Sequence, residues 1–359
     1  MKKVNFLKYL FVIITVLQLN SESISYAQNL TKIDSLLQEK YLPNEPGATF
    51  LIAKNGSIIY KKAFGLSNLE LNVQMKPEDV FQIGSIAKQF TAISVLMLME
   101  KGKLNLDDEI TKFIPDYPTN GNKITIHHLL THTSGIKSYT SMKKLNNISK
   151  KDLTPLELID FFKNEPIDFV PGEEYKYNNS GYVILGYIIE KLTGQSYANF
   201  VEEQIFEKLG MKASQYSSYN EVIKNRASGY HNQDGYINNR KISFTLTYSA
   251  GSLMSNTNDM FKWQEAIKNN LLISKETTEK VFTNYSLNNG GLINYGYGWQ
   301  IKAINNIRSF EHSGFIFGFK SMGVYLPDSD IYVIGLNNCD CNSPTKITRK
   351  IAELVSVIN

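Results

Sequence analysis

The strongest constraint on the fold is that strand-forming segments lie at both ends of the chain and helix-forming segments lie between them. Residues 48–54 and 57–64 are two β-rich runs joined by Asn55-Gly56, a typical hairpin turn. Strand patterns return only after residue 294, and the segments before them carry helical periodicity. We therefore expect one sheet built from both ends of the chain, with helices inserted between its two parts.

The remaining elements follow from the same patterns. Strands are expected at 295–303, 307–311, 320–326 and 331–336, with a turn at 327–330. Helices are expected at 85–101, 127–135 (a short helix closing into a loop), 154–162, 182–192, 197–209, from the cap Asn258-Asp259 to 268, and 345–357. Residues 138–152 are rich in Ser, Lys and Asn, which predicts an exposed loop.

The segment Ser85-Ile-Ala-Lys88 puts a hydroxyl and an amine one helical turn apart. An apolar run over 92–99 follows, so the serine is expected in the first turn of a buried helix with the lysine on the same face. A helix N-terminus offers free N–H groups and the positive end of the dipole, which favour an oxygen that becomes negatively charged. Alternatively, Ser85 is only a helix N-cap and Lys88 a solvated lysine. This interpretation is favoured only if the two residues are considered without the other motifs of the chain.

Acyl transfer through a serine also needs a base and an acid. Lys88 can accept the Ser85 proton only if burial or a neighbouring cation lowers its pKa. Tyr177 is a second candidate base, because a phenolate stabilised by Lys88 can take the proton and later return it to the leaving group. Asn179, two residues further on, can bond both Lys88 and a substrate amide.

The third motif is His312-Ser313-Gly314, followed by Phe315. An edge strand at this point would aim the Phe315 N–H beside the N–H of Ser85. These two donors would form an oxyanion hole. His312 and Ser313 would complete the wall of the substrate pocket.

The order Ser-x-x-Lys, Tyr-x-Asn and His-Ser-Gly resembles the serine β-lactamase and penicillin-binding protein superfamily, and within it the class C β-lactamase-related serine hydrolases. Further segments of the same kind are Leu129 to Ile136, Pro171-Gly172-Glu173, Ala250 to Leu253 and Gly318-Phe319. The resemblance implies an α/β fold, an α+β sandwich of the β-lactamase/transpeptidase type, with an antiparallel sheet flanked by helices and an inserted all-helical lobe. The sheet lobe is expected at about 28–115 and 285–359, and the helical lobe at about 116–284.

The resemblance implies a serine hydrolase that forms an acyl-enzyme on amide or ester carbonyls. Many β-lactamases of the family carry Lys where this chain has His312, whereas His resembles DD-carboxypeptidases, D-aminopeptidases and esterases. Because an imidazole titrates near neutrality, we expect a limb of the pH–rate profile near neutral pH that depends on His312. The alternatives are a penicillin-binding sensor or silent relative that acylates without turnover, and a true class C-like β-lactamase. Peptidoglycan stem peptides and β-lactams are candidate substrates, and specificity is expected in the loops 138–152 and 213–245.

No metal or organic cofactor is implied. His128 and His132 are spaced like metal ligands on a helix, but Leu129 stands where a His-Glu-x-x-His motif has Glu. We therefore favour a ring hydrogen-bonded in a turn over a zinc hydrolase. Lys320, just past the histidine motif, either meets a substrate carboxylate or is a solvated charge at a strand edge, and the second interpretation is the more common. No Gly-x-Ser-x-Gly elbow is present in the sequence.

The N-terminus has the pattern of a secretory signal peptide. Lys2 and Lys3 precede an apolar run over 9–19, and Ser25-Tyr26-Ala27 supplies small residues for cleavage. We expect residues 1–27 to be removed and the protein, starting at Gln28, to be periplasmic or secreted without a membrane anchor.

The charge balance argues against nucleic acid as a partner. The full chain has 38 basic and 34 acidic residues; without the three lysines and one glutamate of residues 1–27 it has 35 and 33. Cys339 and Cys341 are the two cysteines, and they either pair, although so short a loop is tight, or remain free at a strand end. Either state predicts a peripheral structural role. The sequence does not determine the oligomeric state.

Overall fold

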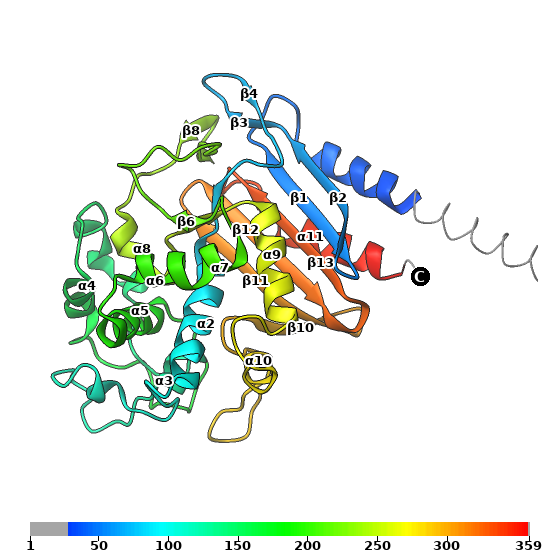
Figure 1. Ribbon diagram of the computed structural model, residues 1–359. Helices are drawn as coiled ribbons and strands as arrows, with labels where there is room; N and C mark the ends of the chain where they lie inside the picture. The colour runs from blue at the N-terminus through cyan, green and yellow to red at the C-terminus, as the bar shows by residue number, and fades with distance from the viewer. Residues whose placement is uncertain (1–27, 358–359) are drawn as a thin grey trace, which may run out of the picture.

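The computed structural model describes residues 28–357, and a six-stranded antiparallel sheet built from both ends of the chain lies at its centre (Figure 1). The strand order is β10-β11-β12-β13-β1-β2. The strands are β1 (Ala48–Lys54), β2 (Ser57–Phe64), β10 (Gln300–Ile304), β11 (Ile307–Ile316), β12 (Phe319–Leu326) and β13 (Ile331–Asn337). Pairing of β1 with β13 joins the two ends of the chain, which confirms the expected sheet.

Helices cover both faces of the sheet (Figure 1). A helix at residues 28–40 and α11 (Thr345–Ser356) lie on one face, where apolar side chains of β12, β13 and both helices form one core cluster. On the other face, α9 (Thr257–Lys268) packs against β1 and β13. The limits expected for the two lobes remain a prediction, and α9 packs on the sheet although its residues fall in the range expected for the helical lobe.

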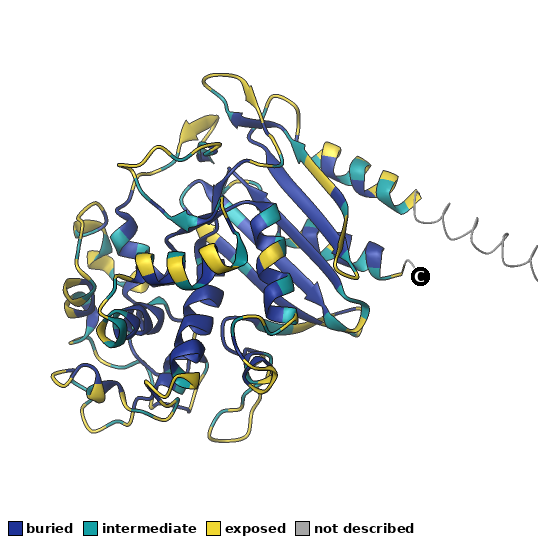
Figure 2. Ribbon diagram, viewed as in Figure 1, coloured by how far each residue is buried: buried dark blue, intermediate teal, exposed yellow. Residues whose placement is uncertain are grey.

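The helical lobe surrounds α2 (Ala87–Glu100), whose residues 87–98 are all buried (Figure 2). Its other helices are α3 (Ile126–Leu130), α4 (Pro155–Phe162), α5 (Asn179–Thr193), α6 (Tyr197–Val201), α7 (Glu207–Leu209) and α8 (Phe244–Gly251), with α10 (Lys275–Val281) nearby. A π-helical turn, η5 (Glu202–Phe206), makes 197–209 continuous. A helix that is apolar on all sides must be enclosed by other elements. Because α2 is enclosed in this way, the turn that precedes it is held in the interior of the molecule.

Short strands tie this turn to the helical lobe. β5 (Phe81–Gln82) leads into the 3₁₀ turn η1 (Gly84–Ile86), and β9 (Leu253–Ser255) follows α8 directly. The two strands pair, with β6 (Gln215–Tyr216) on the other side of β9. Two hairpins, β3 (Leu66–Asn68) with β4 (Val73–Gln74) and β7 (Tyr230–Asn232) with β8 (Tyr236–Asn238), complete the strands.

Several local expectations are wrong. The cap of α9 is Asn256, whose side chain accepts the Asp259 N–H at 2.9 Å, and not Asn258-Asp259. β11 continues to Ile316, so the histidine motif lies inside a strand, whereas β10 begins five residues later than expected, at Gln300. Residues 138–152 contain the 3₁₀ turns η3 (Tyr139–Ser141) and η4 (Lys143–Asn147) and are not exposed throughout, because Tyr139 is buried.

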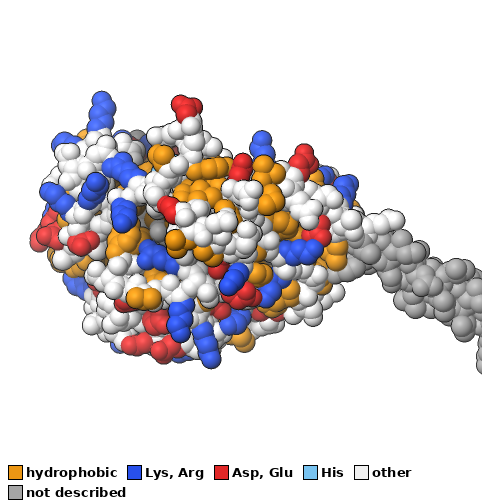
Figure 3. Space-filling view, turned by 90° about the horizontal axis from the view of Figure 1, so that it is seen from above, with side chains coloured by type: hydrophobic (Ala, Val, Ile, Leu, Met, Phe, Trp, Pro, Cys, Tyr) orange, Lys and Arg blue, Asp and Glu red, His pale blue; other side chains and the backbone are white. Residues whose placement is uncertain are grey.

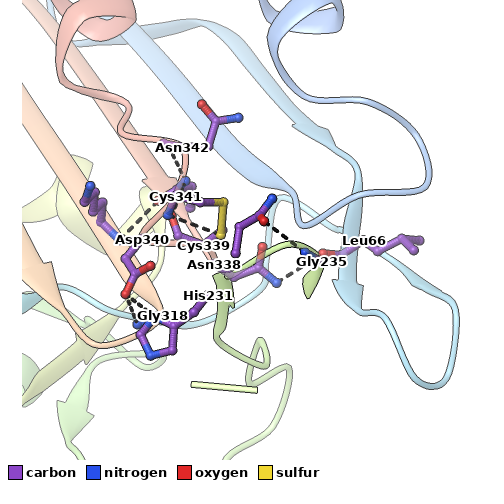
Figure 4. The surroundings of a disulfide bond; sticks show 12 residues. Leu66, His231, Gly235, Gly318, Asn338, Cys339, Asp340, Cys341 and Asn342 are labelled. Atoms are coloured by element: carbon purple, nitrogen blue, oxygen red, sulfur yellow. Dashed lines mark hydrogen bonds and ion pairs between the residues drawn. A yellow bond between two sulfur atoms is a disulfide. The ribbon is translucent and has the colours of Figure 1, made fainter. Parts of the chain in front are cut away.

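Cys339 and Cys341 form a disulfide directly after β13 (Figure 4). Asp340, between them, accepts the N–H of Gly318 at 3.1 Å and pairs with the Nδ1 of His231. Gly318 forms the turn between β11 and β12. The disulfide segment therefore holds the turn that follows the histidine motif.

No helix within residues 28–357 is long and apolar enough to span a membrane. The predicted signal peptide, residues 1–27, lies outside the described residues, so export remains a prediction. The face seen in Figure 3 carries basic and acidic side chains interspersed around a hydrophobic area. This face offers no continuous basic stripe for nucleic acid.

A buried ion pair on β11 gives a test of the fold. Glu311 is fully buried and is paired with Arg349 of α11. Arg349→Gln is expected to reduce the free energy of unfolding by about 3 kcal/mol, because it leaves a buried charge without its partner. Urea unfolding checks this value. The double variant Glu311→Gln/Arg349→Gln is expected to recover most of the loss, and an equally unstable double variant would contradict the explanation.

Candidate active site

Ser85 lies in η1, pressed against β11. A Cβ on Gly84 would lie 2.7 Å from the backbone N and 2.8 Å from the O of Phe315, and Gly84 has a φ of +53°. Glycine is required here for both reasons. Because the N–H and C=O of one strand residue point the same way, the Phe315 N–H faces the η1 turn and not β12. This is the orientation that the predicted oxyanion hole needs.

Lys88 lies directly below Ser85 and is fully buried. Its Nζ lies 3.2 Å from Ser85 Oγ, 2.8 Å from Asn179 Oδ1 and 2.9 Å from the carbonyl O of Ala250. Burial lowers the pKa of the amine well below 10.5 and so favours its neutral form. A neutral amine can donate to Asn179 and Ala250 while its lone pair accepts the Ser85 proton. The geometry therefore fits a base that acts on the serine.

Asn179 begins α5, which Asn178 caps by accepting the Gly181 N–H at 3.0 Å. The Asn179 side chain bridges two partners: its Oδ1 accepts from Lys88, and its Nδ2 donates to Thr140 Oγ1 at 3.0 Å. These bonds fix which end of the amide faces the lysine. Thr140 lies in η3, within the segment 138–152 expected to be an exposed specificity loop, and its bond to Asn179 was not predicted.

Tyr177 precedes this cap and is half-buried, with its ring beside the lysine. Lys88 Nζ lies 4.9 Å from the centre of its ring, and the ring centre of His312 lies 6.0 Å away. Burial raises the pKa of the phenol well above 10, and the nearby Ser85 side chain opposes this shift only in part. Tyr177 is therefore protonated at neutral pH and is suited to donate a proton.

His312 is buried in β11 with both ring nitrogens engaged. Its Nδ1 donates to the Ser313 carbonyl at 2.7 Å, because a carbonyl can only accept, and its Nε2 accepts from the Tyr295 hydroxyl at 3.1 Å. Burial lowers the pKa of His312 to about 3, and a proton on Lys88 would lower it further. A ring that is neutral at physiological pH argues against His312 as the source of the expected limb near neutrality, which stays a prediction.

His132 contributes to the site, which sequence reasoning did not foresee. Its carbonyl accepts the Lys176 N–H at 3.0 Å and its Nδ1 accepts the Asn178 N–H at 3.1 Å, so it holds the residues on both sides of Tyr177. The ring centres of His132 and Tyr177 lie 4.3 Å apart. The preferred interpretation, a ring hydrogen-bonded in a turn, fits this bond but missed its role beside Tyr177.

His128, the other histidine of the pair considered as metal ligands, bonds within its own helix and not to the segment around Tyr177. His128 Nδ1 accepts the Thr125 N–H at 3.3 Å within the capping box of α3. Burial lowers the pKa of both imidazoles, most strongly that of His132. Within residues 28–357, no group of three or more His, Cys, Asp or Glu residues is placed to hold a metal ion.

The carbonyl that holds Lys88 comes from a strained turn in α8. Tyr248 has φ +38° and ψ −130°, a conformation that a bulky residue rarely adopts. The next two carbonyls point to α2: Ser249 O accepts from Thr91 Oγ1 at 2.6 Å, and Ala250 O accepts from Lys88. A backbone acceptor of this kind has no side-chain signature, so the sequence could not identify it.

A pocket of about 530 Å³ opens above Ser85. Ser85, Tyr177, Asn179, His312, Ser313 and Phe315 line it, together with residues of the segments 139–145, 242–251 and 300–317. Gly314 does not; a Cβ on it would lie 2.0 Å from Ile83 O, so it serves the close approach of β11 to η1. The predicted specificity loops contribute Tyr139, Thr140, Leu145 and Ile242.

Lys320 does not line this pocket, although its Nζ lies 5.8 Å from the ring centre of Phe315, which does. Side chains alternate along β12, and the Ser321 hydroxyl donates to Ile83 O at 2.8 Å, beside the η1 turn. Lys320 therefore lies on the opposite face, the face on which Met322 packs in the core cluster with α11. The hypothesis that Lys320 binds a substrate carboxylate is not supported.

Comparison with known proteins identifies the family. The sequence model of the beta-lactamase family matches residues 33–355, most of the chain. The chain belongs to the beta-lactamase family. Its β-lactamase/transpeptidase-like fold and its relationship to penicillin-binding proteins are thus confirmed, and its membership of this family identifies it as a serine hydrolase.

Individual relatives agree with this assignment. The chain is 32% identical to penicillin-binding protein 4* of Bacillus subtilis over 87% of this chain and 71% of that protein. It resembles the octameric penicillin-binding protein homologue of Pyrococcus abyssi with a TM-score of 0.82 and 31% identity, over 91% and 77% of the two chains. A D-amino acid amidase of Ochrobactrum anthropi shares the fold, with a TM-score of 0.79, 22% identity and coverage of 92% and 99%.

The pH profile tests the charge assignment. We expect kcat/KM for an activated ester to rise as the Lys88 ammonium loses its proton, with a midpoint well below 10.5 because burial lowers that pKa. His312→Gln should keep this limb within about half a pH unit, because it replaces one neutral side chain by another. Stopped-flow or steady-state rates between pH 5 and 10 measure it, and disappearance of the limb in His312→Gln would restore the histidine assignment.

A second prediction concerns His132 as a positioning residue for Tyr177. His132→Ala should lower kcat about 10- to 100-fold on an amide, because a displaced acid donates poorly. The loss should be smaller on a 4-nitrophenyl ester, whose leaving group needs no proton. His132→Asn, which tolerates the φ of +61° found here, controls for backbone strain. Equal losses on amide and ester would contradict the link to Tyr177.

Proposed function

We propose that this serine hydrolase cleaves amide or ester bonds through an acyl-enzyme on Ser85, as an exported enzyme of the peptidase or esterase type. The observation that carries the proposal is the buried Lys88 amine, 3.2 Å from Ser85 Oγ and bonded to Asn179 and Ala250. A solvated lysine would be protonated at neutral pH and could not act as a base.

In the first half of the reaction, neutral Lys88 takes the Ser85 proton while Oγ attacks the substrate carbonyl. The N–H groups of Ser85 and Phe315 stabilise the oxyanion that forms. Tyr177 then gives its proton to the leaving group, and the Lys88 ammonium returns a proton to the phenolate. The free leaving group departs, and the acyl group stays on Ser85.

In the second half, water attacks the acyl carbonyl and the same groups act in reverse. Lys88 accepts a proton from the water, and the Ser85 oxygen regains a proton as the bond to the acyl group breaks. Asn179 keeps the lysine oriented through both steps. Both halves balance in protons without another catalyst.

Ser85→Ala is expected to reduce the hydrolysis of 4-nitrophenyl butyrate at least 1000-fold, because the nucleophile is lost. Mass spectrometry of the wild-type protein quenched during turnover should show an adduct of one acyl group on the peptide that contains Ser85. Circular dichroism of the variant checks that the fold is intact.

Three other outcomes would change the assignment. Unchanged turnover in Ser85→Ala would refute the nucleophile. A stable adduct without turnover would favour a sensor that is acylated and not regenerated. Efficient turnover of a chromogenic cephalosporin would favour a β-lactamase.

A further inference from the structure

The pocket above Ser85 carries no formal charge. None of the residues that line it in the described part of the chain is Asp, Glu, Lys or Arg, and His312, its one imidazole, is neutral. Lys88 lies beneath the floor, fully buried, with its Nζ within hydrogen-bond distance of Ser85, Asn179 and Ala250. A charged group of either sign placed in the pocket would therefore lose its hydration without gaining a partner.

Three parts of the chain give the pocket apolar side chains. Tyr139 and Leu145 come from the turns η3 and η4, Ile242 precedes α8 and Leu246 lies in it, and Ile316 and Phe317 stand at and just after the end of β11. These side chains give an acyl chain or an aromatic ring surface to bury. Each buried methylene contributes about 0.8 kcal/mol to binding.

The lysine and arginine side chains near the mouth of the pocket do not line it. Arg240 stacks on Phe317, 5.5 Å from the ring centre, and its Nη2 donates to Asn146 Oδ1 and Ser149 Oγ, each at 3.1 Å. Lys143 and Lys144 are exposed on η4, and Lys302 is exposed on the edge strand β10. Lys320 is half-buried on β12, with its Nζ 5.8 Å from the ring centre of Phe315. None of these five lines the pocket, so they act on a substrate only through solvent, where salt screens them.

We propose that the part of the substrate held in this pocket is apolar and uncharged, so that the enzyme discriminates against a substrate that carries a carboxylate or an ammonium group into the pocket. This inference rests on the proposed function and narrows it. It favours neutral esters and amides with a bulky apolar acyl group. It disfavours peptides with a free terminal D-residue, free D-amino acid amides and β-lactams, since each of these bears a charge next to the reacting carbonyl.

The test compares three esters of equal chain length with the purified wild-type protein: 4-nitrophenyl hexanoate, the mono-4-nitrophenyl ester of adipic acid, and 4-nitrophenyl 6-aminohexanoate. Each kcat/KM is divided by the rate of alkaline hydrolysis, which removes differences in intrinsic reactivity. The ionic strength is about 1 M, where the screening length is about 3 Å. We expect the neutral ester to be preferred at least tenfold over both charged ones. From acetate to hexanoate, kcat/KM should rise up to roughly fourfold per methylene.

Variants at the wall and at the mouth sharpen the test. Leu145 is only partly buried, so Leu145→Lys should fold, and it should raise the adipate-to-hexanoate ratio at least tenfold, whereas Leu145→Met should not. Arg240→Gln should leave the ratio unchanged. A wild-type preference for adipate that disappears in Arg240→Gln would overturn the inference and make Arg240 the carboxylate-binding residue. Equal rates for all three esters would also overturn it, while leaving the proposed function intact. Absence of any Ser85-dependent turnover would instead refute the proposed function.

Discussion

The burial of one amine governs the architecture of the site. Removing an ammonium group from water costs several kcal/mol, so Lys88 either loses its proton or finds acceptors on every side. The fold supplies three hydrogen-bond partners: two acceptors, from α5 and α8, and the Ser85 hydroxyl, from η1. Lys88 is therefore satisfied only when these elements have come together. The serine, the asparagine and the Ala250 carbonyl are positioned by the same requirement, and a shift in any of them changes the environment of the base.

The second constraint is the joint between the sheet and the helical lobe. Gly84 lies in close contact with Phe315, and the N–H groups of Ser85 and Phe315, the proposed oxyanion donors, stay together only while η1 remains against β11. The Ser321 hydroxyl bonds Ile83 O and secures the same turn from β12. Ser85 is thus fixed by the sheet, while its base is oriented by the helical lobe. Catalytic geometry of this kind is a property of the complete fold, because neither part alone contains a full set of donors and acceptors.

The sequence predicted those parts of the site whose chemistry belongs to side chains at fixed spacing. Ser85 and Lys88 follow from the helical period, and Tyr177, Asn179 and His312 from motifs in the expected order. The sequence could not identify Ala250 as a partner of Lys88, because every residue has a carbonyl group. Only the strained turn at Tyr248 directs this one toward the lysine. The burial of Tyr139 was not predicted, because the residues around it in the segment 138–152 are polar and indicate an exposed loop. The cap of α9 was misplaced because Asn256 and Asn258 are equally suited by type, and only the register of the helix chooses between them.

The histidine in the third motif decides how protons move in this site. A lysine at position 312 would place a second cation near Lys88 and Tyr177, which would favour a phenolate. His312 is neutral, and because its Nδ1 proton is engaged by Ser313 O and its lone pair by Tyr295, it has no free N–H to offer the tyrosine. A phenolate at Tyr177 would then depend on the charge of Lys88 alone, and forming it would use up the base. Neutral lysine with protonated tyrosine is the pair that leaves both a base for Ser85 and an acid for the leaving group, so the roles of Lys88 and Tyr177 follow from the residue at position 312.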